Sequence, residues 1–369
     1  MIYLDYNATT PPDPRVTEAI IPCLSEHHGN PSSGHGPGRA ARAAVDQARQ
    51  QLADLLGASP QEIVFTSGGS EANNHALKGV AWSRRSGHLI TSAIEHPAIA
   101  VPCTWLQMQG FDVTTISVDS TGLVDPDDVR RALRPDTILI SIMLANNEVG
   151  TIEPIAEISR IARKAGVLMH TDAAQAVGKI PIRVEELGVD LLSVAGHKFH
   201  APPGCGALYI RQGVQLRSLI HGANHENGRR AGTEAVPFIV GLGLAAELAG
   251  QQLSDQVIRQ LRDRFHRTLT DALGDRVVLN GHPELRLPNT LNVGFKGRIG
   301  AEVLSRLKEV CASPGAACHF DRHEPSPVLQ AMGVAREVAL GAVRFSFGRF
   351  NTEQQIDQAA AEVIDAVQE

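Results

Sequence analysis

Two polar side chains stand where buried strands of the chain are predicted to end. Short apolar runs at 168–171 and 191–194 are bounded by turn residues and predict two buried strands of an α/β sheet. Asp172 directly follows the first run, and Lys198 lies just beyond the second, in the segment Ser-Val-Ala-Gly-His-Lys-Phe. Ligands of open α/β sheets bind outside the carboxyl ends of the strands, so we expect this acid and this amine to face one cleft.

An acid and a lysine that face one cleft suit the chemistry of pyridoxal phosphate. The lysine forms a Schiff base with this cofactor, and the carboxylate keeps the ring nitrogen protonated so that the ring withdraws electrons. Each residue alone has an ordinary alternative, because a strand-end Asp often caps a helix and a Lys is often a solvated charge. The prediction therefore depends on the features that accompany the pair.

A glycine-rich turn and a histidine are two such features. Ser67-Gly68-Gly69-Ser70 leads from a predicted strand at 62–66 into a helix. Backbone N–H groups and the helix dipole at such a turn hold a phosphate, although Ser70 is alternatively a simple helix cap. His96 follows a predicted strand at 89–92, where an imidazole stacks on a flat ring and moves protons, or merely caps the next helix.

A loop near the C-terminus, at about 311–326, carries a candidate nucleophile. Small residues and prolines argue against regular structure there and predict a mobile segment, with Cys318 beside His319 and Arg322. Cationic neighbours lower the pKa of a thiol and favour the thiolate. One alternative is packing as a small hydrophobe, which suits Cys23, Cys103 and Cys205 better. A second alternative is a zinc site with the ligands Cys311, Cys318, His319 and His323. The two cysteines of this set are not spaced as the close Cys pair typical of structural zinc.

The elements that would position these residues alternate along the chain. Further strands are predicted at 113–118 and 137–143, and helices after Pro97, at 126–133 and at 154–165, which implies a mainly parallel sheet. A long helical pattern at 235–273 is expected to cross a domain boundary near Gln251. We expect residues 14–250 to form a large cofactor-binding domain. Residues 1–13 and 251–369 are then a small α/β domain that carries the cysteine loop.

Composition narrows the class of protein. The 369 residues suffice for one large and one small domain, and 43% hydrophobic with 20% charged residues is typical of a soluble protein. The net charge is -6 and no basic stripe stands out, so we expect neither nucleic acid nor membrane as a partner. No signal peptide and no apolar run of about 20 residues is found, which predicts a cytoplasmic protein. Five scattered cysteines do not form a disulfide framework.

The motifs, taken in order, resemble those of the cysteine desulfurases in the pyridoxal-phosphate-dependent class V aminotransferase family. The C-terminal loop is also similar to that of selenocysteine lyases. The resemblance runs nearly end to end: LDYNATTP at Leu4, GNPSS at Gly29, FTSGGSEANN at Phe65, SAIEHPA at Ser92, MLANNEVG at Met143, HTDAAQAVGK at His170, SVAGHKF at Ser193, GTE at Gly232, GAACH at Gly315 and VRFSFGRF at Val343. It implies an α/β transferase fold of type I, with a large domain whose mainly parallel sheet is flanked by helices and a smaller α/β C-terminal domain.

The resemblance also implies roles for individual residues, with no metal among them. Lys198 would carry pyridoxal 5'-phosphate and remove the substrate's α-proton, and Asp172 would pair with the pyridine nitrogen. Gln175 would bind the phenolic oxygen, and His96 would stack on the ring. The phosphate would be held by Gly69, Ser70, Ser193 and His197, and by Thr233 from the neighbouring subunit of a homodimer. The substrate carboxylate would be bound by Asn147 and Arg344, and Cys318 would take the sulfur as a persulfide.

The implied reaction converts L-cysteine to L-alanine and passes sulfur to an acceptor protein, as in iron-sulfur cluster assembly. The loop Gly-Ala-Ala-Cys-His fits selenocysteine lyase chemistry on L-selenocysteine as well. An aminotransferase of the same fold and a sulfur-relay scaffold are further alternatives. Two departures from the family pattern are Ser70, where Thr is usual, and Gly222-Ala223-Asn224, where relatives have a run of glycines. The Cβ atoms in the second segment restrict the backbone of the intersubunit loop.

Overall fold

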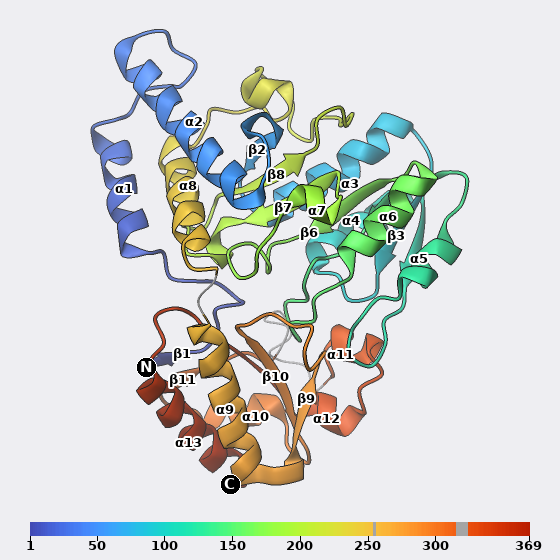
Figure 1. The fold of residues 1–369 in the computed structure, drawn as a ribbon, viewed down its shortest axis with the longest axis vertical. Coiled ribbons are helices and arrows are strands. Elements are labelled where there is room, and N and C mark those ends of the chain that lie inside the picture. Colours follow the sequence, from blue (N-terminus) through green and yellow to red (C-terminus); the bar gives the residue numbers. More distant parts are fainter. Residues whose placement is uncertain (254–255, 315–323) are drawn as a thin grey trace.

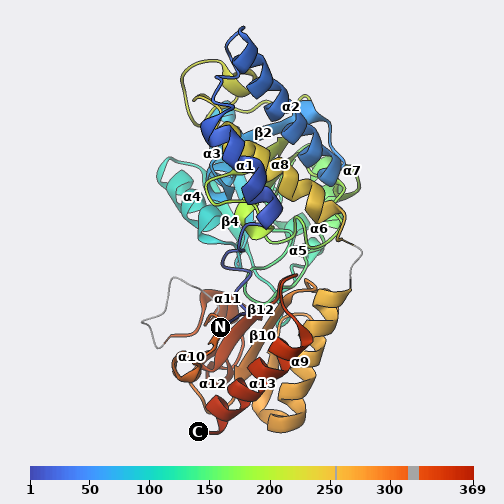
Figure 2. The ribbon, with the colours of Figure 1, turned by 90° about the vertical axis from the view of Figure 1, so that its left-hand side faces the viewer.

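The computed structural model describes residues 1–253, 256–314 and 324–369. These residues form two packed parts, a larger one around a seven-stranded sheet and a smaller one around a three-stranded sheet (Figure 1). The chain begins in the smaller part, where β1 (Ile2–Tyr3) pairs in parallel with β11 (Val310–Cys311). The side view agrees, with the N-terminus beside the strands of the smaller part (Figure 2).

The large sheet is mainly parallel, which confirms the predicted fold class. Within this sheet, the adjacent strands β7, β6, β5, β3 and β4 all run parallel to one another, and β8 alone is antiparallel to both strands beside it. In spatial order the strands are β2 (Ile63–Thr66), β8 (Gly206–Ile210), β7 (Leu191–Ala195), β6 (Leu168–Asp172), β5 (Thr137–Ser141), β3 (His88–Ser92) and β4 (Asp112–Ile116).

Helices cover both faces of this sheet. Successive strand side chains point to opposite faces, so Leu191 packs in one apolar cluster and Leu192 in the other. The Leu191 cluster includes α3 (Gly69–Arg84) and α4 (Pro97–Met108). The Leu192 cluster includes α1 (Pro14–Ser25), α2 (Gly36–Leu56), α5 (Pro126–Ala132), α6 (Ile155–Ala165), α7 (Val184–Leu187) and α8 (Val236–Gly250). Alternation therefore turns the side chains of residues 170, 172, 193 and 195 toward α3.

The smaller part has its own apolar core. Phe265 and Phe345 pack with their ring centroids 4.8 Å apart, and Leu4 from the N-terminal segment is fully buried beside them. Its antiparallel strands lie in the order β12 (Ala342–Ser346), β10 (Thr290–Phe295) and β9 (Val277–Asn280). Its helices are α9 (Val257–Leu273), α10 (Gly300–Arg306), α11 (Pro327–Ala331), α12 (Arg336–Leu340) and α13 (Glu353–Gln368).

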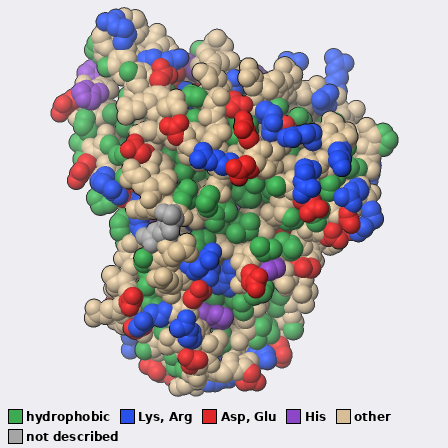
Figure 3. All heavy atoms as spheres, viewed as in Figure 1, with side chains coloured by type: hydrophobic (Ala, Val, Ile, Leu, Met, Phe, Trp, Pro, Cys, Tyr) green, Lys and Arg blue, Asp and Glu red, His purple; other side chains and the backbone are tan. Residues whose placement is uncertain are grey.

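The long helical pattern predicted at 235–273 is two helices. One ends at Gly250 and the next begins at Val257, with polar residues between them. The first packs in the core of the large sheet and the second in the core of the small part, so one straight helix would not serve both. Among the described residues, none of the helices has the length and apolarity needed to cross a bilayer. On the face shown in Figure 3, basic and acidic side chains are interspersed.

Candidate active site

Asp172 is the last residue of β6, and only 5% of it is exposed. Asn73, on α3, donates a hydrogen bond to Oδ2 of Asp172 at 2.7 Å, and the backbone N–H of Ala174 donates to Oδ1 at 2.9 Å. These two donors fix the orientation of the carboxylate. A buried anion held in this way is suited to keep a proton on the nitrogen of a bound ring.

Lys198 lies just after β7, in a short turn of helix at 196–198. Its amine donates to the backbone carbonyl groups of Asn7 at 2.6 Å and Ala8 at 2.9 Å. Burial, followed by the positive charge of Arg344, lowers the pKa of Lys198 to about 8, although Asp172 opposes the shift. A useful fraction of the amine is therefore neutral near neutral pH, and the neutral amine is the form that attacks a carbonyl group.

His96 begins α4 as its N-cap. Its Nδ1 accepts a hydrogen bond from the backbone N–H of Ala98 at 3.1 Å, so the proton of the neutral ring lies on Nε2. Burial lowers the pKa of His96, Asp172 opposes this shift, and Lys198 adds to it. The charges of these two residues thus act directly on the imidazole. The capping role of His96 does not compete with stacking, because capping uses only one ring nitrogen.

The N-terminus of α3 is open. The N-cap is Gly68, at φ 150°, and no side chain in the described part of the chain caps the first turn, so Ser70 is not the cap considered as an alternative. The first intrahelical bond runs from Ala72 N to Gly68 O, which leaves the N–H groups of residues 69–71 outside the helical pattern. A Cβ built on Gly69 would lie 3.1 Å from the Cβ of Ala195, so this turn packs over the end of β7. The exposed Ser70 adds a hydroxyl at this helix end.

Ser193, which the resemblance places at the phosphate, lies deeper in the sheet than the glycine turn. Its side chain is fully buried, and its hydroxyl lies 3.0 Å from Nε2 of His170. Side chains on one face of a strand recur every second residue, so Ser193 lies one position deeper on the α3 face than Ala195. Ala195, rather than Ser193, lies under the glycine turn. The sequence-based assignment overlooked this register.

His197 lies near the start of the chain. Its Nδ1 is 3.1 Å from Oγ1 of Thr9, and the ring is half-buried. Burial, with the charges of Lys198 and Lys179 adding to it, lowers the pKa of His197 to about 4. The ring is therefore neutral at physiological pH in the protein as described, and a phosphate bound beside it would raise this pKa.

Gln175 and Asn7 connect the cofactor side to the N-terminal segment. Gln175 is 5% exposed, and its Nε2 donates to the carbonyl O of Asn7 at 2.9 Å. Its Oε1 accepts a hydrogen bond from Lys179 at 2.6 Å. The same Asn7 carbonyl accepts from Lys198, so the amide of Gln175 and the amine of Lys198 converge on one acceptor.

Arg344 and Asn147 meet on the opposite side of the site. Arg344 belongs to β12, and its guanidinium donates to the Asp5 carboxylate at 2.8 Å and to the carbonyl O of Asn147 at 2.9 Å. Among the described residues, Nε of Arg344 is buried with no hydrogen-bond partner. Such an unpaired donor, next to the half-exposed side chain of Asn147, is what a substrate carboxylate would satisfy.

Three residues of the site, of which Asn7 and Asn73 are buried, were missed from the sequence. Asn73 holds Asp172, Asn7 accepts from Lys198, and Glu95 accepts from the backbone N–H of Met143 at 2.9 Å. The signal for Asn73 was its position in the first turns of the helix after the glycine turn, and for Glu95 its place next to His96. Nothing local could have revealed Asn7, because its partners are scattered over the whole chain.

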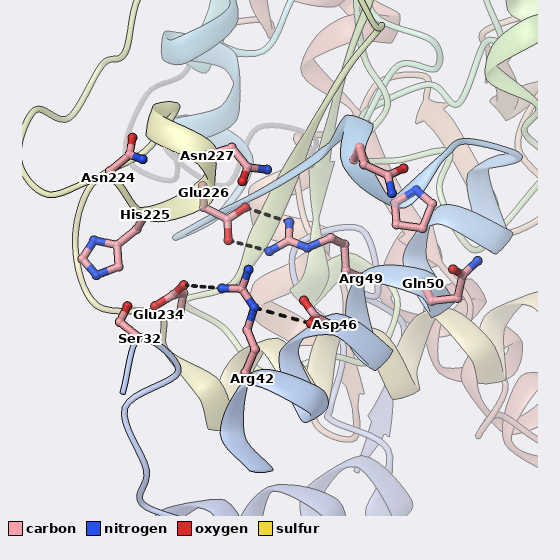
Figure 4. A pocket seen from close by; sticks show the side chains of 12 residues that line it. Ser32, Arg42, Asp46, Arg49, Gln50, Asn224, His225, Glu226, Asn227 and Glu234 are labelled. Carbon is pink, nitrogen blue, oxygen red and sulfur yellow. Dashed lines mark hydrogen bonds and ion pairs between the residues drawn. The ribbon is translucent and has the colours of Figure 1, made fainter. Parts of the chain in front are cut away.

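The loop 221–234 is tied to α2. Glu226 forms a bidentate ion pair with Arg49, at 2.7 and 2.8 Å, and Glu234 lies 3.8 Å from Arg42 (Figure 4). These pairs border a pocket of about 440 Å³. The loop with Ala223 and Asn224 is thus anchored to the large part of the chain. Thr233 lies on it with an exposed side chain.

Cys318 lies outside the described residues, as do His319 and His323. The other cysteines are free thiols: Cys103 and Cys205 are buried, and Cys23 and Cys311 are half-buried. Burial raises the pKa of the Cys103 and Cys205 thiols to about 12, so neither is a thiolate at physiological pH. Over residues 1–253, 256–314 and 324–369, no group of three or more His, Cys, Asp or Glu side chains is arranged to hold a metal ion.

The site fits pyridoxal phosphate in several respects. The uncapped helix end at 69–71 offers N–H donors for a phosphate, and its Gly69 lacks the Cβ that would crowd Ala195. At the other end, a buried anion, Asp172, and an amine of lowered pKa, Lys198, suit the ring nitrogen and the aldehyde carbon.

Comparisons with known proteins agree with this chemistry. The family description Aminotransferase class-V matches residues 2–359. The chain is 48% identical to cysteine desulfurase IscS of Methanosarcina thermophila, over 100% of this chain and 92% of that protein. A solved NifS-like protein superposes with a TM-score of 0.92 at 40% identity, covering 99% of this chain and 98% of that one.

A second solved structure, SspA in complex with cysteine, matches with a TM-score of 0.86 at 38% identity, over 95% of this chain and 100% of that one. The aminotransferase class-V match spans nearly all of the chain, and the likeness to cysteine desulfurases is high along its full length. The chain belongs to the aminotransferase class-V family, and within it to the cysteine desulfurases.

Proposed function

We propose that this chain is a pyridoxal-phosphate-dependent enzyme that removes sulfur from L-cysteine and releases L-alanine. The observation that carries the proposal is the convergence of Lys198 and Asp172 at adjacent strand ends, with Arg344 facing them from the smaller part. The likeness to SspA, which is solved in complex with cysteine, supports the choice of substrate.

When bound, the cofactor supplies a ring that withdraws electrons from the substrate's α-carbon. Lys198 would hold the cofactor through its amine, and its Nζ would take the α-proton of the substrate. Its lowered pKa makes it a base near neutral pH. Asp172, fixed by Asn73, would keep a proton on the ring nitrogen. His96 would cover one face of the ring, and Gln175 would donate to the phenolic oxygen.

The remaining contacts orient the substrate and the phosphate. Arg344 and Asn147 bind the substrate carboxylate, and the unpaired Nε of Arg344 is the donor available for it. Gly69, Ser70 and His197 hold the phosphate at the start of α3. We further propose a homodimer in which Thr233 reaches the phosphate site of the other subunit. Its exposed position on the anchored loop 221–234 supports this role.

The sulfur acceptor within the chain is proposed to be the thiolate of Cys318. It attacks the substrate sulfur, an S–S bond forms, and the C–S bond breaks with its electron pair left on the carbon side. That carbon then takes a proton, the proton held at Nζ of Lys198 returns to the α-carbon, and alanine leaves. The outer sulfur of the Cys318 persulfide passes to an acceptor protein. The half-buried Cys311 and Cys23 are free thiols too, and they serve as controls for this assignment.

We also propose the division of the chain into a large domain, 14–250, and a small domain, 1–13 with 251–369. Two observations support this division: the separate apolar cores, and the burial of Ile2 and Leu4 in the core that contains Phe345. The active site then lies between the domains, because Arg344 contacts Asn147 from the other side.

The test compares alanine formation from L-cysteine and from L-selenocysteine for the wild type, Cys318→Ala and the matched control Cys311→Ala. We expect turnover of cysteine to be lost only in Cys318→Ala. If Cys318→Ala keeps its cysteine turnover, the persulfide step is wrong. If it loses turnover of cysteine while retaining turnover of selenocysteine, the selenocysteine lyase alternative is favoured. Formation of an amino acid that depends on an added keto acid would indicate an aminotransferase.

A further inference from the structure

A second lysine lies next to the site, and the proposed reaction gives it no task. Lys179 follows β6 by seven residues, and its amine donates to Oε1 of Gln175 at 2.6 Å and to Oδ1 of Asn7 at 3.0 Å. Burial, followed by the charges of Lys198 and Arg344, lowers the pKa of Lys179 well below its usual value. An amine is costly to enclose in this way, so its contacts call for an explanation beyond solvation.

The two partners of the Gln175 amide allow only one orientation of that amide. A backbone carbonyl only accepts hydrogen bonds, so the atom facing Asn7 O must be the amide nitrogen. The oxygen then faces Lys179, whose amine donates to it at 2.6 Å. Each partner favours this orientation, and the two together hold the amide at both its nitrogen and its oxygen.

The orientation matters for the reactive end of the cofactor. The Gln175 nitrogen carries two hydrogens, and the described residues account for one of them, at Asn7 O. That same carbonyl accepts from Lys198 at 2.6 Å, so the second hydrogen of Gln175 is available beside the amine that carries the cofactor. A donor at this position stabilises the deprotonated phenolic oxygen of the ring and reduces the affinity of the neighbouring nitrogen for a proton.

We propose that Lys179 is a positioning residue that fixes the Gln175 amide with its N–H toward the phenolic oxygen of pyridoxal phosphate and thereby sets the protonation of the Lys198–cofactor linkage. This inference rests on the proposed role of Gln175. Lys179 is not required to place Asn7, because Asn289 also donates to Asn7 Oδ1 at 3.0 Å, and Asn7 Nδ2 donates to Thr290 at 2.8 Å. The charged or titratable groups that interact with Lys179 are Lys198, Arg344, His197 and His200.

The test is a pH titration of the visible absorption of the cofactor-loaded protein. Lys179→Met removes the donor at similar length, Gln175→Leu removes the amide, and the double variant removes both. Lys296→Met, at an exposed lysine, is the matched control. We expect the titration midpoint of Lys179→Met to rise by about one pH unit. The double variant should match Gln175→Leu, because a residue that acts through Gln175 has nothing to act on once Gln175 is removed.

Two results would overturn the inference: a Lys179→Met midpoint equal to those of the wild type and Lys296→Met, or a Lys179→Met shift that adds in full to that of Gln175→Leu. Thermal unfolding of the cofactor-free variants checks that they fold. If Lys179→Met does not fold, Lys179→Gln takes its place, with the same expected direction. If the wild type itself binds no pyridoxal phosphate or forms no alanine from cysteine, it is the proposed function that fails, and this result is separate from the behaviour of Lys179.

Discussion

The two sides of the active site are built in different ways. On the cofactor side, Asp172 ends β6, Lys198 follows the adjacent β7, and Asn73 on the covering helix holds Asp172. On the substrate side, Arg344 meets Asp5, which is 339 residues away in the sequence, and Asn147, which is 197 residues away. One side is therefore fixed by a single packed sheet, and the other by how the two parts of the chain meet.

This difference implies a division of labour. On the cofactor side, buried side chains each form two hydrogen bonds, and they could rearrange only if the sheet moved. This side is therefore suited to hold groups that transfer protons. On the substrate side, the Arg344 guanidinium is paired with Asp5 and must also bind the carboxylate of each incoming substrate. Substitutions on the cofactor side should therefore alter the rate of the chemical step. Substitutions on the substrate side should alter substrate binding.

The largest effect is expected for Lys198→Ala. This change removes both the amine that holds the cofactor and the base for the α-proton, and we expect the rate of alanine formation to fall about 10⁴-fold, the upper end for one positioned proton-transfer group. Stopped assays of alanine measure the rate, and visible absorption shows whether the cofactor is held covalently. Lys296→Ala, at an exposed lysine, is the control and should behave as wild type. A fall of less than tenfold would exclude Lys198 as the base.

The second prediction concerns pH and the same amine. Because the pKa of Lys198 is lowered to about 8, loading of the cofactor-free protein with pyridoxal phosphate should accelerate about tenfold per pH unit from pH 6 and level off above about pH 8. Between about pH 8 and the ordinary lysine pKa, Lys198 is protonated in the unfolded chain and neutral in the folded one. Ionised Lys198 therefore destabilises the fold below pH 8, and this destabilisation disappears as the pH rises through that window. A loading rate that still climbs beyond pH 10 would contradict the shift.

The contrast between the two sides also explains what the sequence could predict. The strands before Asp172 and Lys198, the glycine turn at Gly69 and the mainly parallel sheet follow from short local patterns, and the structure has all of them. Local patterns did not reveal that Ser193 lies one position below Ala195, because that requires the strand register to be known relative to the helix above. They also did not reveal Asn7, whose side chain contacts Lys179, Asn289 and Thr290 from two distant segments.

The third prediction moves to the substrate side. Arg344→Lys keeps a positive charge but loses the planar fork that serves Asp5, Asn147 and a substrate carboxylate together. We expect KM for cysteine to rise about tenfold, the equivalent of one hydrogen bond to a charged group, with kcat changed much less. Steady-state kinetics separate the two parameters. A fall in kcat at constant KM would instead place Arg344 in the chemical step and erase the contrast between the two sides.

The smallest effect is expected for Asp5→Asn, and its two consequences have opposite signs. The Asp5 carboxylate competes with the substrate for the Arg344 guanidinium, so its removal should lower KM for cysteine about threefold, within the range of one partly exposed ion pair. The same change leaves a buried guanidinium without its counter-ion, and the free energy of unfolding should fall by about 1–3 kcal/mol. Asp365→Asn, on the C-terminal helix α13, is the control for the general effect of removing one acid. If KM rises instead, Asp5 orients Arg344 for the substrate and does not compete with it, and the substrate side would then be as preorganised as the cofactor side.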